Sequence, residues 1–205
     1  MLATPLLAAA RPASAQTANS LSFVLHAAFF SLEAKQPTLV DPQVFVEEDG
    51  APGGVGPQNI THASGLRPAQ LMDPPGSALF AANGTPLGFT LQTWAAAQGS
   101  VNLAPEGGGT HVAARFVRLI PNGRYSLFEN HFAPEGVSFS PLDGTGTRNS
   151  FTSAADGTAT IVLTAPGAVT HANAVLLVYH SDGKDHGIQR GSVGVTAHHQ
   201  LIARP

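Results

Sequence analysis

Residues 176–187 read LLVYHSDGKDHG and place two histidines and two aspartates directly after an apolar run. His180 ends the apolar run, and His186 follows after a turn through Asp182 and Gly183. Imidazole nitrogens and carboxylate oxygens bind zinc or copper, and the same groups serve as general acids and bases. This stretch is therefore the first candidate for a metal site or a catalytic site.

Two further stretches carry the same side chains at strand-like spacing. Alternate residues of a strand share a face, so Glu129 and His131 project together. His198 and His199 are adjacent and point to opposite faces, so only one of them can join a given site. If these strands neighbour the one that ends at His180, their side chains converge on a single copper or zinc ion. The candidate metal ligands are His131, His180, His186, His198, His199 and Glu129.

Two other interpretations of these residues stay open. Histidine and aspartate at strand ends commonly hydrogen-bond to loop backbone, which would make the group a structural polar cluster. Catalysis has less support, because Ser181 lies between His180 and Asp182, and three neighbours in sequence cannot converge as a triad. The chain has no cysteine, no G-x-S-x-G elbow and no H-E-x-x-H motif. The sequence therefore favours a protein that is not an enzyme and predicts no catalytic residue.

Composition excludes one class of partner. The 205 residues fit one domain with an appendage, and only 11% are charged, against about 25% in ordinary soluble domains. The formal net charge is −3, and the ten lysines and arginines are scattered along the chain. Binding to nucleic acid needs clustered cations that meet phosphates, so we expect no nucleic-acid partner.

The N-terminal stretch MLATPLLAAARPASAQT predicts export. It is short and apolar, and Ala13-Ser14-Ala15 forms an A-x-A cleavage site before Gln16. The stretch lacks a positively charged n-region, which a misassigned start codon would explain. No later segment reaches the roughly 18 uninterrupted apolar residues of a membrane span. We therefore expect residues 1–15 to be a signal peptide and the mature chain to be secreted or periplasmic.

Strand and turn signals dominate the rest of the chain and predict an all-β fold. With 22 glycines and 16 prolines, the sequence favours short strands joined by tight turns. An Asn-Gly turn at 121–123 predicts that 111–120 and 124–132 form a hairpin, and Asp156-Gly157 predicts another within 149–165. Residues 173–180 are typical of a buried central strand. The pattern indicates an antiparallel β-sandwich.

Two segments depart from this pattern. Thr90 can cap one short helix over about 90–98, which Gly99 would end. Residues 50–86 are dense in glycine and proline without sustained periodicity, as in a linker. We therefore divide the chain into a signal peptide (1–15), an irregular N-terminal arm with a Gly/Pro-rich linker (16–84) and a β-sandwich domain (85–205).

Four blocks of the sequence carry a resemblance. They read PLGFTLQTWAAAQGSV, RLIPNGRYSLFENHF, NSFTSAADGTATI and LLVYHSDGKDHG, and they fall within residues 84–203. Their most distinctive pieces are the L-I-P-N-G-x-Y turn and the Y-H-x-D-G-x-x-H-G loop. With them the chain resembles an uncharacterised family of exported bacterial and archaeal β-rich proteins. The resemblance implies an exported β domain and no activity.

We therefore expect a non-enzymatic, exported β-sandwich that binds a ligand or a component of the cell envelope. The alternative is a copper- or zinc-binding protein of the periplasm or cell exterior, with possible redox activity at the C-terminal histidines. Both predictions depend on which side chains the strands bring together.

Overall fold

The computed structural model describes residues 19–134 and 136–205, so the predicted signal peptide lies outside the described residues. All named strand pairs are antiparallel, which confirms the predicted all-β class. In chain order the elements are β1 (Asn19–Ser22), β2 (Val24–Leu25), α1 (His26–Glu33), β3 (Val40–Glu47), β4 (Gly54–Val55), the 3-10 turn η1 (Pro57–Asn59), β5 (Thr61–His62), β6 (Leu66–Gln70), β7 (Ala78–Phe80), β8 (Pro86–Thr90), α2 (Leu91–Ala95), β9 (Gln98–Glu106), β10 (Gly109–Val117), β11 (Arg124–Ala133), β12 (Gly136–Pro141), β13 (Ser150–Thr152), β14 (Ala159–Ala165), β15 (Asn173–His180) and β16 (Ala197–Ala203).

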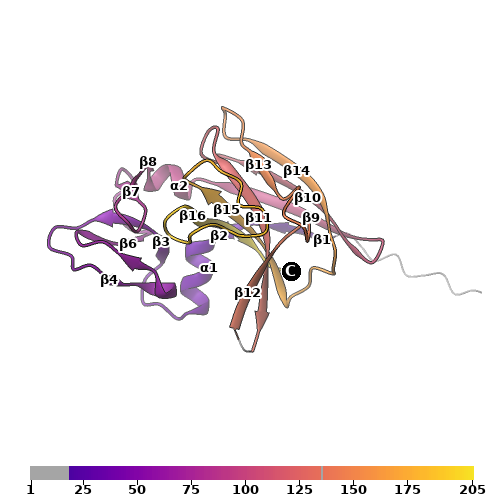
Figure 1. Ribbon diagram of the computed structural model, residues 1–205, viewed down its shortest axis with the longest axis horizontal. Coiled ribbons are helices and arrows are strands. Elements are labelled where there is room, and N and C mark those ends of the chain that lie inside the picture. The colour runs from indigo at the N-terminus through magenta and orange to yellow at the C-terminus, as the bar shows by residue number, and fades with distance from the viewer. Residues whose placement is uncertain (1–18, 135) are drawn as a thin grey trace, which may run out of the picture.

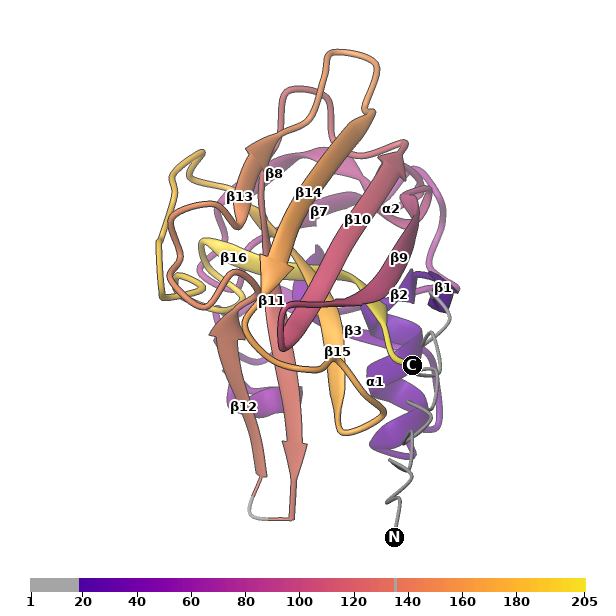
Figure 2. The ribbon, with the colours of Figure 1, turned by 90° about the vertical axis from the view of Figure 1, so that its right-hand side faces the viewer.

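Two sheets pack face to face and form the sandwich (Figure 1, Figure 2). Sheet A has the order β1-β9-β10-β14. Sheet B has the order β12-β11-β15-β16-β2, with β13 also paired to β11. Strand β15 lies between β11 and β16, as expected for a buried central strand, and all of its residues after Asn173 are buried.

The alternation of side chains in the strands produces the core between the two sheets. In β10, Val112, Ala114 and Phe116 point inward, while Arg115 points to solvent. The inward side chains of sheet B come from its three central strands. They are Tyr125, Leu127, Val175, Leu177, Tyr179, Leu201 and Ala203. The opposite face of sheet B, which we call its outer face, has a smaller apolar cluster that includes Phe128, Leu176, Val178 and Ile202.

Both turns that predicted hairpins form, but neither joins two paired strands. The turn at 121–123 leads from β10 in sheet A to β11 in sheet B, and the Asp156-Gly157 turn leads from β13 back to β14 in sheet A. Gly157 has φ +74°, and a Cβ there would lie 2.5 Å from the Leu119 carbonyl oxygen, so the two crossings touch. The predicted hairpins were therefore wrong, because a tight turn dictates a reversal of direction and not which strands pair.

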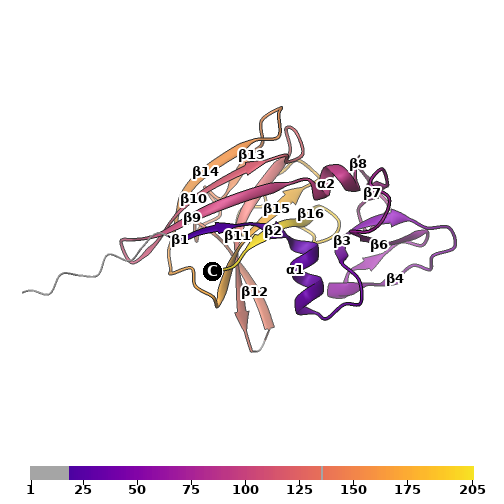
Figure 3. The same ribbon diagram turned by 180° about the vertical axis from the view of Figure 1, so that it is seen from behind.

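The N-terminal part of the described chain is also more regular than predicted. Strand β1 pairs with β9 in sheet A, β2 pairs with β16 in sheet B, and α1 lies against the outer side of sheet B (Figure 3). The region predicted as arm and linker also forms a small β4-β5 pair and three strands of a third sheet, sheet C, with the order β6-β3-β7-β8, in which β8 comes from the predicted sandwich domain. Residues 19–84 are therefore not an irregular arm, since they complete both sheets of the sandwich and add a small β layer beside it.

The predicted short helix exists as α2, with Thr90 at its N-cap accepting a hydrogen bond from the Thr93 backbone N–H. It ends at Ala95, earlier than predicted, because Gln98 and Gly99 already belong to β9. Its Trp94 is buried in the core, as a helix anchor should be. The longer helix α1 was missed as the main helix of the chain. Neither of these two helices in the described residues has the length and apolar character to cross a membrane.

Candidate functional site

Sheet B separates the histidines that the sequence offered as one set of metal ligands. His180 and His199 lie on its outer face, whereas His198, Glu129 and His131 lie on the core side. The opposite orientation of His198 and His199 follows from their adjacent positions in β16, as predicted. The neighbouring arrangement of β11, β15 and β16 is also as assumed. The structure therefore brings the strands together but does not bring all six side chains to one point.

The histidines on the core side have structural partners. His198 is fully buried, its Nδ1 lies 2.9 Å from the Gln43 carbonyl oxygen, and its Nε2 lies 3.2 Å from Ser181 Oγ. His131 Nε2 lies 2.8 Å from Ser140 Oγ, and its Nδ1 lies 3.9 Å from the carboxylate of Glu129. Glu129 and His131 therefore do project together. Burial raises the pKa of Glu129, while the neighbouring histidine opposes that rise.

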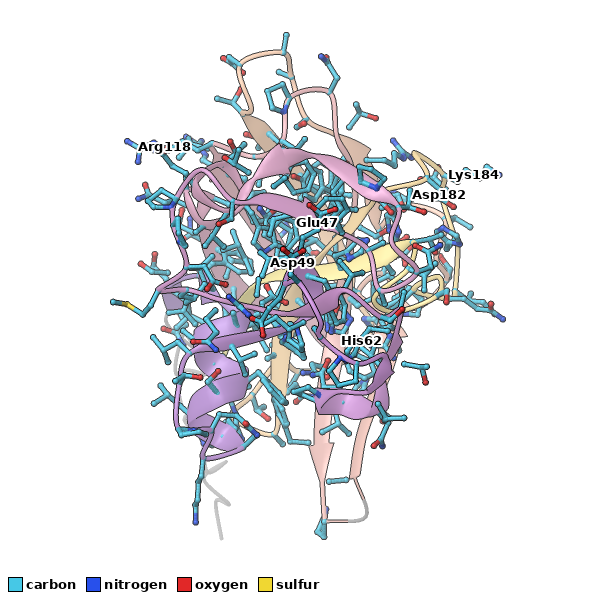
Figure 4. The ribbon with its side chains drawn as sticks, turned by 90° about the vertical axis from the view of Figure 1, so that its left-hand side faces the viewer. Glu47, Asp49, His62, Arg118, Asp182 and Lys184 are labelled. Atoms are coloured by element: carbon cyan, nitrogen blue, oxygen red, sulfur yellow. The ribbon has the colours of Figure 1, made fainter. Side chains whose placement is uncertain are left out.

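His180 and His186 come together at the end of β15. Their ring centroids lie 5.0 Å apart, and His186 Nε2 lies 3.2 Å from a carboxylate oxygen of Asp182. His180 Nε2 bonds to Ser126 Oγ, while its Nδ1 is buried and has no hydrogen-bond partner. Asp182 lies beside Lys184 on the loop after β15, at the rim of the molecule (Figure 4). These contacts orient the loop and leave one imidazole nitrogen unsatisfied.

A second loop supports the one that carries His186. Asp143 accepts hydrogen bonds from the Thr145 hydroxyl and from the backbone N–H groups of residues 145–148, and these bonds lower its pKa to about 2 against the effect of burial. The loop they close brings Gly146, with φ +73°, against Gly187. A Cβ at Gly146 would lie 2.3 Å from the Gly187 carbonyl carbon, so this close approach requires glycine. The loop at 143–148 therefore packs directly against the 181–196 loop, which carries His186.

A cavity of about 650 Å³ opens on the outer side of sheet B, between α1 and the β11-β12 hairpin. This volume lies within the range of roughly 300–1,000 Å³ usual for small-molecule sites. Its walls are mostly apolar and aromatic. The lining residues are His26, Phe29, Phe30, Glu33, Ala34, Gln58, Asn59, Ile60, Asn130, Phe132, Val137, Phe139, Arg190, Val193 and His199.

Buried polar groups form part of the cavity lining. His26 and Asn130 are both buried, and His26 Nδ1 and Asn130 Oδ1 have no hydrogen-bond partner in the described chain. His26 is the first residue of α1, and its ring meets the His199 ring edge-on at a centroid distance of 4.9 Å. Buried polar groups in proteins are normally satisfied, so unsatisfied ones that line a cavity mark a place for a ligand or water.

His199 and Arg190 complete the polar part of the lining. His199 Nδ1 lies 2.9 Å from Gln43 Nε2, and its Nε2 lies 2.9 Å from the Arg190 guanidinium. The guanidinium carbon stacks 3.3 Å above the centre of the Phe139 ring. Arg190 forms no salt bridge with any carboxylate of residues 19–134 and 136–205. Burial lowers the pKa of Arg190 to about 10, so it is a cation at neutral pH.

Sequence reasoning found His199 but missed His26, Asn130, Gln43 and Arg190. Asn130 was within reach, because it lies in the same β11 stretch as Glu129 and its alternation places it on the other face. The remaining three come from a helix start, an N-terminal strand and a loop. No local pattern in the sequence predicts that these segments lie next to one another in the fold.

Among the described residues, no three histidine, aspartate or glutamate side chains are grouped so that they could hold a metal ion. The prediction that copper or zinc binds is not tested by this geometry, but a single six-ligand centre is not formed. The chain matches no family model, no curated protein and no solved structure in the three comparisons with known proteins. The resemblance to exported β-rich proteins therefore stays a prediction.

The buried histidines should make the fold sensitive to acid. Burial lowers the pKa of His26 to about 3 and those of His180 and His198 to about 4, and it lowers the pKa of His199 well below its ordinary value. In the unfolded chain these groups titrate near 6.5, so below that pH the unfolded state binds more protons and the free energy of unfolding falls. Asp41 acts in the opposite sense, because burial raises its pKa to about 6.

We therefore expect the free energy of unfolding to fall by on the order of 4 kcal/mol per pH unit near pH 5, from four histidines opposed by one aspartate. Urea unfolding at pH 7, 6 and 5 measures this slope. His198→Gln should reduce it, whereas the exposed His171→Gln should not. A free energy of unfolding that stays constant from pH 7 to pH 5 would contradict the buried, neutral state of these histidines.

Proposed function

We propose that this protein is a non-enzymatic binding protein that holds a small amphipathic molecule in the cavity on the outer face of sheet B. The observation that carries the proposal is the combination of a mostly apolar cavity of about 650 Å³ with buried polar groups that lack hydrogen-bond partners. Such sites bind by burying apolar surface and orient the ligand through a few polar contacts.

The aromatic walls support this function. Phe29 of α1 and Phe132 of β11 both line the cavity, and their rings pack against each other at a centroid distance of 5.9 Å. Val137 has 54% of its surface exposed although it lines the cavity. These side chains would be covered by a bound apolar group, and burying them would contribute about 25 cal/mol per Å² of apolar surface.

An uncharged apolar dye tests the cavity without assuming any charge on the ligand. We expect Nile red to bind the wild-type protein at one site per chain with a rise in fluorescence. Val137→Asp places a carboxylate on the wall and should weaken the dye roughly tenfold, because the charge loses hydration when the dye covers it. Val162→Asp is the matched control, because Val162 is 51% exposed on β14 of the other sheet.

Equal dye affinity in the two aspartate variants would contradict binding in this cavity. No saturable dye binding to the wild-type protein would contradict the proposed function altogether. Both valines are exposed, so neither substitution should disrupt folding, and the urea midpoint of each variant verifies this.

Export is part of the proposal and rests on the A-x-A stretch at Ala13-Ser14-Ala15. A protein produced from residues 1–205 in a bacterial host should be recovered outside the cytoplasm with Gln16 as its first residue. Mass spectrometry of the recovered chain gives its N-terminus. An intact chain that stays in the cytoplasm would contradict export and would leave the cavity experiment unaffected.

A second candidate function is copper or zinc binding at the end of β15. It is favoured by the unpartnered Nδ1 of His180 and by the 5.0 Å between the His180 and His186 rings. Asp182 is not grouped with both histidines in the described structure, so it would become a third donor only after it releases its contact with His186.

Calorimetric titration of the untagged protein with Cu²⁺ or Zn²⁺ tests this candidate. We expect one ion per chain, with affinity reduced at least about tenfold by His180→Gln or His186→Gln, since each removes one of three ligands. His171→Gln, at an exposed residue just before the opposite end of β15, should bind as the wild type does. Substoichiometric metal that neither substitution changes would exclude the site.

A further inference from the structure

We propose that the ligand of the cavity is an amphipathic monoanion, a carboxylate on an apolar tail, whose carboxylate is bound by Arg190 and His199. This inference rests on the proposed function and adds the chemical class of the ligand. It follows from two hydrogen-bond donors in the cavity lining that face each other without an acceptor. A network of buried groups fixes both donors in this arrangement.

The network starts at Gln43, whose side-chain amide can take only one orientation. Gln43 Oε1 accepts a hydrogen bond of 2.7 Å from the His199 backbone N–H, so the amide nitrogen must be the other end of the side chain. That nitrogen donates to Gln58 Oε1 at 2.7 Å and faces His199 Nδ1 at 2.9 Å. His199 Nδ1 is therefore the acceptor nitrogen of the ring.

The tautomer of His199 follows from this orientation. Burial and the neighbouring cation lower the pKa of His199 well below its ordinary value, so the ring is neutral and carries one proton. With Nδ1 as acceptor, that proton lies on Nε2, which becomes a donor. Nε2 faces the Arg190 guanidinium at 2.9 Å, and a guanidinium has donors only. Two donors thus meet with no acceptor between them.

An oxyanion resolves this conflict, because its oxygens accept from both donors at once. Arg190 presents a planar fork of N–H groups that suits a carboxylate, and stacking on Phe139 fixes the plane of that fork. The charge of Arg190 is also unmatched, since no carboxylate of the described chain pairs with it. Of the two neighbouring groups without a partner, His26 Nδ1 can donate to one of the remaining lone pairs when it carries the ring proton, whereas Asn130 Oδ1 is an acceptor and cannot bond to the anion.

The charges around the cavity favour a monoanion over a phosphate dianion. Arg190 is the one lysine or arginine among the lining residues, and Glu33 of the same lining is an acid. A second negative charge would therefore lack an unpaired cation, because Arg204, which stacks on the lining residue Phe132, is already paired with Glu33 at 3.8 Å. The phenylalanine walls and the volume suit an alkyl or aryl tail of medium length. We infer a fatty or aromatic carboxylate.

Calorimetric titration with decanoate and with 1-decanol tests the inference, since the two probes share an alkyl tail and differ in the headgroup. We expect the wild type to bind decanoate at least about tenfold more tightly than decanol, because hydrogen bonds to charged groups exceed neutral ones. Arg190→Met should remove this preference and leave decanol affinity unchanged. Arg190→Lys keeps the charge without the fork and should retain part of the preference.

Arg115→Met is the matched control, because Arg115 is exposed on sheet A, on the far side of the sandwich, and both probes should bind it as they bind the wild type. Urea unfolding of each variant without ligand shows whether it folds, and Arg190→Met should be no less stable than the wild type, since it removes an unmatched charge. The Lys variant keeps the test valid if Arg190→Met fails to fold.

Equal wild-type affinities for decanoate and decanol would overturn the anion and leave the proposed cavity function standing. Unchanged decanoate affinity in Arg190→Met would overturn the role of Arg190. Failure of both probes to bind, together with failure of Nile red, would overturn the proposed function and this inference with it.

Discussion

The contact between β3 and β16 through Gln43 is the constraint on which the site depends. Gln43 is fully buried, and it bonds to two adjacent residues of β16 that face opposite sides of sheet B. Its carbonyl oxygen accepts from His198 on the core side, while its side-chain amide holds both the backbone N–H and the ring of His199. One residue thereby attaches the small β layer to the sandwich and sets the protonation of the histidine in the cavity.

The same junction contains a buried carboxylate, which needs hydrogen-bond donors because it is removed from water. Asp41, two residues before Gln43, accepts from the Gln43 backbone N–H and from Trp94 Nε1 at 2.9 Å. These hydrogen bonds lower its pKa, but desolvation dominates and raises the pKa to about 6. Gln200 continues the network by donating to the Trp94 carbonyl oxygen. The hydrogen bonds of this network fix the arrangement of the β3-β16 junction, although the buried Gln200 Oε1 has no hydrogen-bond partner in the described chain.

The sequence predicted the strands better than it predicted how they meet. Periodicity located β15 and its neighbours, and the rule of alternation separated His198 from His199 correctly, because both depend on local geometry. Turn residues predicted reversals at 121–123 and at Asp156-Gly157, but the chain uses both to cross between sheets. Which strands pair is decided by the burial of whole faces, and no single turn carries that information.

The cavity could not be predicted from the sequence for a related reason. Its polar groups are contributed by His26 at the start of α1, Asn130 in β11 and Arg190 in a loop, so they are distant in the chain and have no motif spacing. The dense glycine and proline of 50–86 also suggested a linker, whereas that segment builds sheet C and supplies Gln58, Asn59 and Ile60 to the cavity. Irregular composition there reflects short strands and tight turns.

The hydrogen bonding of the histidines differs between the two faces of sheet B. On the core side of sheet B, His198 and His131 have partners for both ring nitrogens. On the outer side, His180, His26 and Asn130 each keep a buried polar atom without a partner, and His199 faces a cation with its remaining nitrogen. Unsatisfied buried groups cost free energy. Two of these atoms, His26 Nδ1 and Asn130 Oδ1, belong to residues that line the cavity, where a ligand or water can hydrogen-bond to them, in agreement with the proposed binding function.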